Sequence, residues 1–208
     1  KCGVELIASD TPAGCEILVR GKQTHAAYPQ SGINAVTALL AVISELPLAG
    51  AAFEAAKELS RLFPHGDWLG EGCGIAQSDE ISGELTISAD IFELDETGLK
   101  LECDSRVPIC ADEANCREAL EQMAREAGFE VTGGMIAAHH TPGDGEFVQS
   151  LLKCYEHYTG LKGECVSTGG GTYVHDIEGG VGFGISMPGF ESNLHGANER
   201  INIQDALT

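Results

Sequence analysis

The sequence has few basic residues and no long apolar segment. It contains 12 Lys and Arg against 32 Asp and Glu, which gives a formal net charge of -20 at pH 7 over 208 residues. Because this charge repels phosphate backbones, we expect no nucleic-acid partner. No apolar run approaches the roughly 18 residues that a membrane span needs, and no basic segment followed by an apolar one marks a signal peptide. We therefore expect a cytoplasmic protein without membrane association.

Several short motifs are also missing. The eight cysteines include no C-x-x-C pair, which favours free, mostly buried thiols in a reducing compartment over disulfides or a zinc knot. No G-x-G-x-x-G string and no Gly-Lys-Ser/Thr string occurs, so the glycine-rich stretch 168–173 lacks the usual nucleotide signature. The structural interpretation of this stretch is a tight turn that leads into a helix. Its backbone N–H groups could still bind a carboxylate or an oxyanion.

Periodicity in the first half of the chain gives an order of elements. Residues 15–25 alternate apolar and polar side chains, as a half-buried strand does, and apolar residues then recur at helical spacing up to Pro47. A second helix is predicted over 51–62. The stretch 83–108 predicts two strands that are joined by a turn at 95–98, where a glycine can take a positive φ.

A capped helix and a last strand complete this part of the chain. Asp112 precedes an apolar helical face and Gly128 follows it, which are common start and end signals, and residues 129–140 then predict a strand. The order is βαββαβ, a ferredoxin-like arrangement of the α/β (α+β) class with an insertion before the hairpin. We place this domain at 15–140, after a linker or remnant at 1–14.

The composition changes from about residue 141 onward. A helix is predicted over about 144–160, and irregular glycine-rich stretches follow it, where backbone can approach a ligand closely. We assign residues 141–208 to a second domain or part of one. The chain starts without methionine and stops where an amphipathic helix has barely begun, so we expect a piece of a longer protein.

Three side chains in these loops could carry chemistry. His25 lies between a strand end and a Pro-and-Gly turn, where it either packs or points at a ligand. Arg106 ends a strand, so its guanidinium either pairs with one of the many acids or holds a ligand carboxylate. His195 lies in the string LHGANE, where an imidazole could reach a metal. Taken singly, each residue has a structural interpretation that is commoner than the functional one.

Together these stretches resemble the M20 family of zinc aminoacylases and dipeptidases, and within it the PepV-like dipeptidase branch. GKQTHAAYPQSGINAV, SRVP, HHTPGDGEFVQSLLKCYEHYTG, GGGTY and LHGANE occur in the order of the family. The resemblance implies that the ferredoxin-like domain is a lid. It also implies that the remainder is the C-terminal portion of an α/β zinc-peptidase catalytic domain.

The resemblance also implies roles for individual residues. His25 would stabilise the oxyanion, Arg106 would clamp the C-terminal carboxylate of a dipeptide substrate, and His195 would be a metal ligand. Two zinc ions are implied for the intact enzyme, with manganese or cobalt as alternatives. The backbone expected beside the substrate is that of Gly169, Gly170 and Gly171.

Other parts of the family's machinery are not matched here. The family needs an H-x-D pair, a bridging aspartate, a Glu-Glu pair and a further acidic ligand. We expect neither an H-x-D string nor an adjacent Glu-Glu within this chain, and we expect these groups before residue 1. Relatives often carry an arginine just after GGGTY, where this chain has Val174 and His175. The role of His175 is open. We therefore expect an inactive fragment that can self-associate, derived from a dipeptidase that can be monomeric. The alternatives are a non-catalytic ferredoxin-like interaction or dimerisation module and a phosphate-binding regulatory domain.

Overall fold

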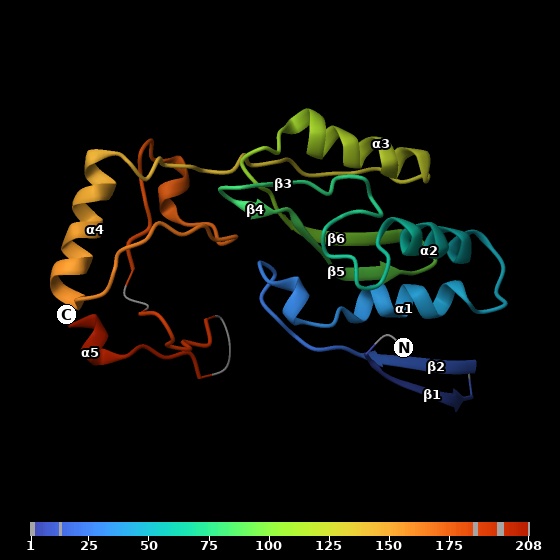
Figure 1. The fold of residues 1–208 in the computed structure, drawn as a ribbon. Helices are drawn as coiled ribbons and strands as arrows, with labels where there is room; N and C mark the ends of the chain where they lie inside the picture. Colours follow the sequence, from blue (N-terminus) through green and yellow to red (C-terminus); the bar gives the residue numbers. More distant parts are fainter. Residues whose placement is uncertain (1–2, 13, 185–186, 195–197, 208) are drawn as a thin grey trace. The chain divides into compact units, whose positions relative to one another are not determined.

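The computed structural model describes residues 3–12, 14–184, 187–194 and 198–207 (Figure 1). The chain divides into two compact units, Lys1–Ala138 and His139–Thr208. Within the described residues, no helix is long and apolar enough to cross a membrane.

The first unit starts with an antiparallel hairpin of β1 (Glu5–Thr11) and β2 (Gly14–Arg20). The two strands pair along their whole length, with Leu6 opposite Val19. Residues 5–11 of the segment expected to be a linker or a remnant of a preceding segment are therefore a paired strand, which a linker would not be. All side chains of β1 are exposed, so the strand does not need the alternation of apolar and polar residues by which a half-buried strand is predicted. Backbone pairing with β2 holds β1 in place.

Two helices follow at the predicted positions. A short 3-10 turn, η1 (Pro29–Ser31), precedes α1 (Ala35–Ser44), and α2 (Ala51–Leu62) comes next. In Figure 1, α1 lies between the β1–β2 hairpin and β5, the strand that starts at Thr86. The two helices pack through a buried cluster of Leu40, Ala56 and Leu59.

The predicted hairpin is confirmed as β5 (Thr86–Leu94) and β6 (Leu99–Arg106), which pair antiparallel with a register shift between Ala89 and Ile91. Asp95 closes the turn, because its Oδ1 accepts the N–H groups of Thr97 and Gly98 at 2.7 and 3.2 Å. Gly98 does not have a positive φ, so the carboxylate takes the role expected of the glycine. The insertion before this hairpin holds β3 (Ser78–Asp79) and β4 (Gly83–Glu84).

The third predicted helix begins with a π turn, η2 (Glu113–Arg117), and continues as α3 (Glu118–Glu126). Asp112 caps it as predicted: its carboxylate accepts the N–H of Asn115 at 2.8 Å, and the Asn115 side chain accepts the N–H of Asp112 at 2.8 Å. Gly128 follows the helix with φ +86°, which also agrees with the prediction.

The strand predicted over 129–140 is wrong, since this segment is irregular. Arg117 supplies a physical reason, because its Nη2 donates to the carbonyls of Val131 at 3.3 Å and Gly133 at 3.1 Å. Those carbonyls are thus bonded to a side chain instead of a neighbouring strand. The described strands make three separate two-stranded sheets, so the unit is mixed α/β and the single sheet of a ferredoxin-like fold is not confirmed.

A second buried cluster joins the insertion, β5 and η2. It consists of Cys73, Ile75, Leu85, Ile87, Ala111 and Cys116. Burial, with a smaller contribution from the Asp67 carboxylate, raises the pKa of the Cys73 thiol to about 12. The seven cysteines within the described ranges are all free, as expected, but only Cys73 and Cys116 are buried, so the expectation of mostly buried thiols is wrong.

The second unit contains α4 (Glu146–Thr159), a 3-10 turn η3 (Tyr173–Asp176) and α5 (Ile203–Ala206). Gly160 ends α4 with φ +69°, but the expected apolar face is only partly buried: Val148 is buried, whereas Phe147 is 59% exposed. The Gly180 carbonyl accepts the Thr141 hydroxyl at 2.7 Å and lies 2.8 Å from Nε2 of His139, which ties the start of the unit to residue 180.

Asn34 connects α1 to β5 through both ends of one amide. Its Oδ1 accepts the N–H of Thr37 at 3.0 Å, which caps the helix, and its Nδ2 donates to the carbonyl of Ala89 at 2.8 Å. The helix start and the strand are therefore held by the same side chain.

Two replacements of Asn34 should destabilise the first unit to different extents. Asn34→Ala should lower the free energy of unfolding by about 1–2 kcal/mol, because it removes the cap and the bond to β5. Asn34→Ser keeps a good capping oxygen but cannot reach Ala89, so it should lose less. Urea unfolding followed by circular dichroism measures both; equal midpoints for the wild type and both variants would contradict this account.

Candidate functional site

The loop that carries His25 is closed by a pair of backbone hydrogen bonds. Lys22 and Ile33 exchange N–H and carbonyl groups at 3.0 and 2.9 Å, and the Lys22 ammonium donates to the Ser31 carbonyl at 2.9 Å. A Cβ on Gly21 would lie 2.0 Å from the Ile33 carbonyl oxygen, so a glycine is required there. These contacts fix the path of the loop on both sides of His25.

His25 is half-buried within this loop, and one ring nitrogen has a defined partner. Its Nδ1 accepts the N–H of Ala27 at 3.0 Å, and its carbonyl accepts the N–H of Tyr28 at 2.9 Å. Because Nδ1 acts as an acceptor, the neutral ring carries its proton on Nε2. The structure therefore presents His25 as an Nε2–H donor.

Arg106 is paired with an acid on its own strand. It stands at the end of β6 opposite Thr86, and its Nε and Nη2 donate to the two carboxylate oxygens of Asp104 at 2.7 and 2.8 Å. The side chains are 30% and 32% exposed, respectively. Sequence reasoning left ion pairing and ligand binding as alternatives for Arg106 and missed Asp104. The spacing i, i+2 on a strand, which puts two side chains on one face, is the signal for this pair.

The chain beyond Arg106 is anchored as well. Pro108 is fully buried, and the next two N–H groups donate to Ser82 Oγ at 2.8 Å and to Asp79 Oδ2 at 3.3 Å. Asp79 also accepts the Ser82 hydroxyl at 2.6 Å, and the hydrogen bonds from Ser82 hold the pKa of that carboxyl well below its usual range. The backbone of Arg106 is thus fixed before and after the residue.

The His25 loop and Arg106 are both attached to β5. The loop ends at Asn34, which bonds the Ala89 carbonyl, and Arg106 pairs opposite Thr86. Thr86 and Ala89 are three residues apart, about 10 Å along a strand. The loop that carries His25 and the strand that carries Arg106 are therefore both anchored to β5.

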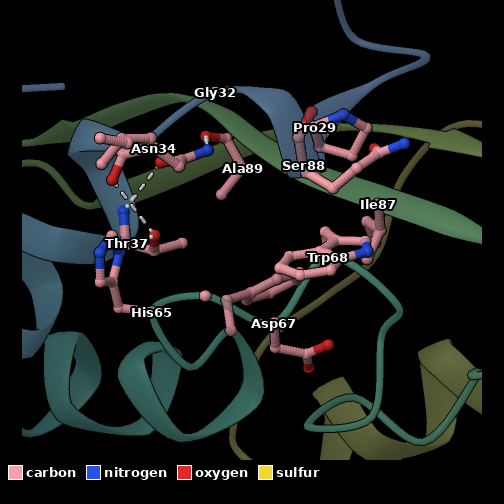
Figure 2. A pocket seen from close by; sticks show the side chains of 14 residues that line it. Pro29, Gly32, Asn34, Thr37, His65, Asp67, Trp68, Ile87, Ser88 and Ala89 are labelled. Carbon is pink, nitrogen blue, oxygen red and sulfur yellow. Dashed lines mark hydrogen bonds between the residues drawn. The ribbon is translucent and has the colours of Figure 1, made fainter. Parts of the chain in front are cut away.

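A cavity of about 210 Å³ lies between η1, the start of α1, residues 63–68 and β5 (Figure 2). Thr37 and His65 are on one side of it, with 2.9 Å between the hydroxyl oxygen and Nδ1, and Trp68 lies on the other side. Neither His25 nor Arg106 lines this cavity. Its residues connect the His25 loop to β5 and do not form part of the predicted site.

His65-Gly66-Asp67, at the edge of this cavity, spells an H-x-D string that sequence reasoning missed. The carboxylate of Asp67 is used in a turn: it accepts the N–H groups of Leu69 and Gly70 at 3.0 Å each, and that of Gly72 at 2.8 Å. The string therefore shapes the insertion.

In the second unit, the predicted Gly169, Gly170 and Gly171 lie between Thr168 and η3. The Gly170 N–H bonds to Thr168 Oγ1 at 3.2 Å, and a Cβ on Gly171 would meet nothing within 4 Å. Packing among the described residues thus does not demand a glycine at 171. His175 is exposed on η3, with its ring centroid 5.7 Å from that of His139.

The predicted metal ligand, His195, lies outside the described residues. Within the described ranges, no group of three or more His, Cys, Asp or Glu side chains is arranged to hold a metal ion. A catalytic zinc takes about three protein ligands, so these residues do not by themselves fit one.

Residues 8–87 match the family model M20_dimer, described as the peptidase dimerisation domain. The matched stretch runs from β1 into β5 and contains the whole His25 loop. Residues 8–87 are therefore similar to the dimerisation domain of M20 peptidases.

Relatives extend the similarity over nearly the whole chain. "Putative dipeptidase YtjP" of Bacillus subtilis (strain 168) is 33% identical over 189 residues, which are 90% of this chain and 40% of that protein. "Beta-Ala-Xaa dipeptidase" of Lactobacillus delbrueckii subsp. lactis is 31% identical over 195 residues, 92% of this chain and 41% of that protein. The chain spans about two fifths of the length of these relatives. It belongs to the M20 peptidase family, and the resemblance noted from its motifs is confirmed.

Proposed function

We propose that this chain is the lid domain and the C-terminal part of the catalytic domain of a metal-dependent dipeptidase. The intact enzyme would hydrolyse dipeptides that have a free C-terminal carboxylate. The observation that carries the proposal is the attachment of an Nε2–H donor loop and an arginine to the same strand, β5. The names of the two relatives support the substrate class, and the free cysteines support a cytoplasmic location.

His25 would act on the oxyanion that forms when water attacks the scissile carbonyl. A neutral imidazole that carries its proton on Nε2 can donate a hydrogen bond to this oxygen as negative charge develops. The Ala27 N–H on Nδ1 favours that tautomer before the substrate arrives. The donor would therefore be oriented in advance, which is where such groups are most effective.

In the full-length enzyme, His25→Ala should lower kcat about 10²- to 10³-fold and change KM little, because the contact strengthens only in the transition state. His25→Gln, which keeps an N–H donor of similar reach, should retain part of the rate. Steady-state kinetics on one dipeptide measures both variants. A rise in KM with an unchanged kcat would contradict the oxyanion role.

Arg106 would bind the C-terminal carboxylate of the dipeptide, since guanidinium groups bind carboxylates with parallel N–H donors. The backbone of Gly169 to Gly171 would lie beside the substrate. Glycine there would allow the close approach that a Cβ would hinder.

Arg106→Ala should raise KM for a dipeptide with a free carboxylate about tenfold or more, the size of a lost charge-assisted hydrogen bond. The C-terminal amide of the same dipeptide should be hydrolysed as by the wild type, because it has no carboxylate to hold. Competition kinetics with both substrates gives the ratio directly. Equal losses on the two substrates would exclude the clamp.

The metal is proposed to be zinc, with manganese or cobalt as alternatives, and M20 dipeptidases are generally metal-dependent. A bound zinc ion supplies Lewis-acid chemistry and lowers the pKa of its water. His195 is the proposed ligand from this chain. Since the described residues hold no three-ligand group, the other ligands would lie outside them.

This chain by itself should neither bind zinc tightly nor hydrolyse dipeptides, because one matched ligand is too few for a catalytic zinc. Isothermal titration with zinc, followed by a dipeptide assay on the purified chain, measures both, with His195→Ala as the control. Submicromolar one-to-one binding that His195→Ala abolishes, together with turnover, would contradict this assignment.

The second candidate function is a non-catalytic dimerisation module, which the match to the dimerisation domain favours. The β1–β2 hairpin has no third strand among the described residues and exposes Leu6, Ile7 and Leu18. A dimer by light scattering, with activity of the full-length protein indifferent to changes at His25 and Arg106, would support a dimerisation role for this domain over a part in catalysis.

A further inference from the structure

We propose that Asp104 is a positioning residue that orients Arg106 for the substrate carboxylate; this inference rests on the clamp role proposed above. The backbone of Arg106 is held by its pairing with Thr86 and by the buried Pro108. Its long side chain still has several rotatable bonds. The contact that fixes the guanidinium is the one with Asp104.

The geometry of the pair leaves one edge of the guanidinium available. The group has five N–H donors, and Asp104 takes the Nε–H and one Nη2–H from the side. Within the described part of the chain, the Arg106 guanidinium has no other hydrogen-bond partner. The edge formed by Nη1 and Nη2 therefore remains for a second carboxylate, which can bind there with two parallel hydrogen bonds.

Strand register places Asp104 beside Arg106. The two residues are two apart on β6, so they share one face, and their partners on β5 are Ser88 and Thr86. The Ser88 hydroxyl, opposite Asp104, donates its hydrogen bond to Asp90 at 2.6 Å. Asp104 is thus held by the same ladder that holds Arg106.

Asp104 is expected to help the substrate bind. The two carboxylates would occupy different edges of the guanidinium, so they do not compete for the same N–H groups. An arginine without a fixed partner, in a chain with 32 acids, would pair with other carboxylates at either edge and would have to be released and reoriented on binding. A competing Asp104 would instead predict tighter binding once it is removed.

The test is Asp104→Asn in the full-length enzyme, assayed with a dipeptide that the wild type hydrolyses, such as alanylalanine, and with its C-terminal amide. Asparagine has the same shape, but it can accept only one of the two N–H groups and has no charge. KM for the free dipeptide should rise about tenfold, with kcat nearly unchanged and the amide unaffected.

Two further variants make the result specific. Glu102→Gln removes the partner of Lys100, an ion pair with the same i, i+2 spacing on the same face of β6, and should leave both substrates unaffected. In the Arg106→Ala background, Asp104→Asn should add no further loss, because the group it orients is gone.

A fall in KM, a fall in kcat on both substrates, or an equal effect of Glu102→Gln would overturn the positioning role. If Arg106→Ala separates the two substrates but Asp104→Asn behaves like the wild type, this inference alone is wrong. If Arg106→Ala does not separate them, the proposed clamp is wrong and the inference falls with it.

Discussion

Asn34 is the residue on which the arrangement of the first unit depends. One amide satisfies an otherwise unpaired N–H at the start of α1 and donates to the carbonyl of Ala89 in β5. The loop that carries His25 is closed by the Lys22–Ile33 pair and is followed at once by Asn34. Because Asn34 is bonded to β5, the loop is held close to that strand. The position of the His25 loop over β5 is therefore a consequence of how one helix is capped.

The large excess of acids has a structural use that the net charge does not reveal. Asp67, Asp79, Asp95 and Asp112 each accept backbone N–H groups in a turn or at a helix start. Donors of this kind favour the charged form, and hydrogen bonds lower the pKa of both Asp79 and Asp95. Several of the acids thus shape the loops that separate the strands, in a chain whose described sheets each have two strands.

Sequence reasoning succeeded where a local signal determined the structure. The cap at Asp112, the glycine after α3 and the apolar spacing of α1 are all local, and those elements lie where they were predicted. It failed at residues 129–140, because the partner that replaces a neighbouring strand is the distant side chain of Arg117. The site shows the same limit: His25 stands in a motif, whereas the choice of Asp104 as the partner of Arg106 depends on β-strand geometry.

The charge balance also bears on how such a chain can hold an anionic substrate. With 12 basic residues against 32 acidic ones, an arginine at a sheet edge will be paired with some carboxylate before any ligand arrives. A partner from a flexible surface segment could take either edge of the guanidinium, and an anionic ligand would then have to displace it. A partner two residues earlier on the same strand takes one defined edge, from the side, and neutralises the cation without covering the Nη1–Nη2 edge. In an acidic protein, a fixed acid beside an arginine is therefore a way to keep the outer edge of the guanidinium available for a ligand carboxylate.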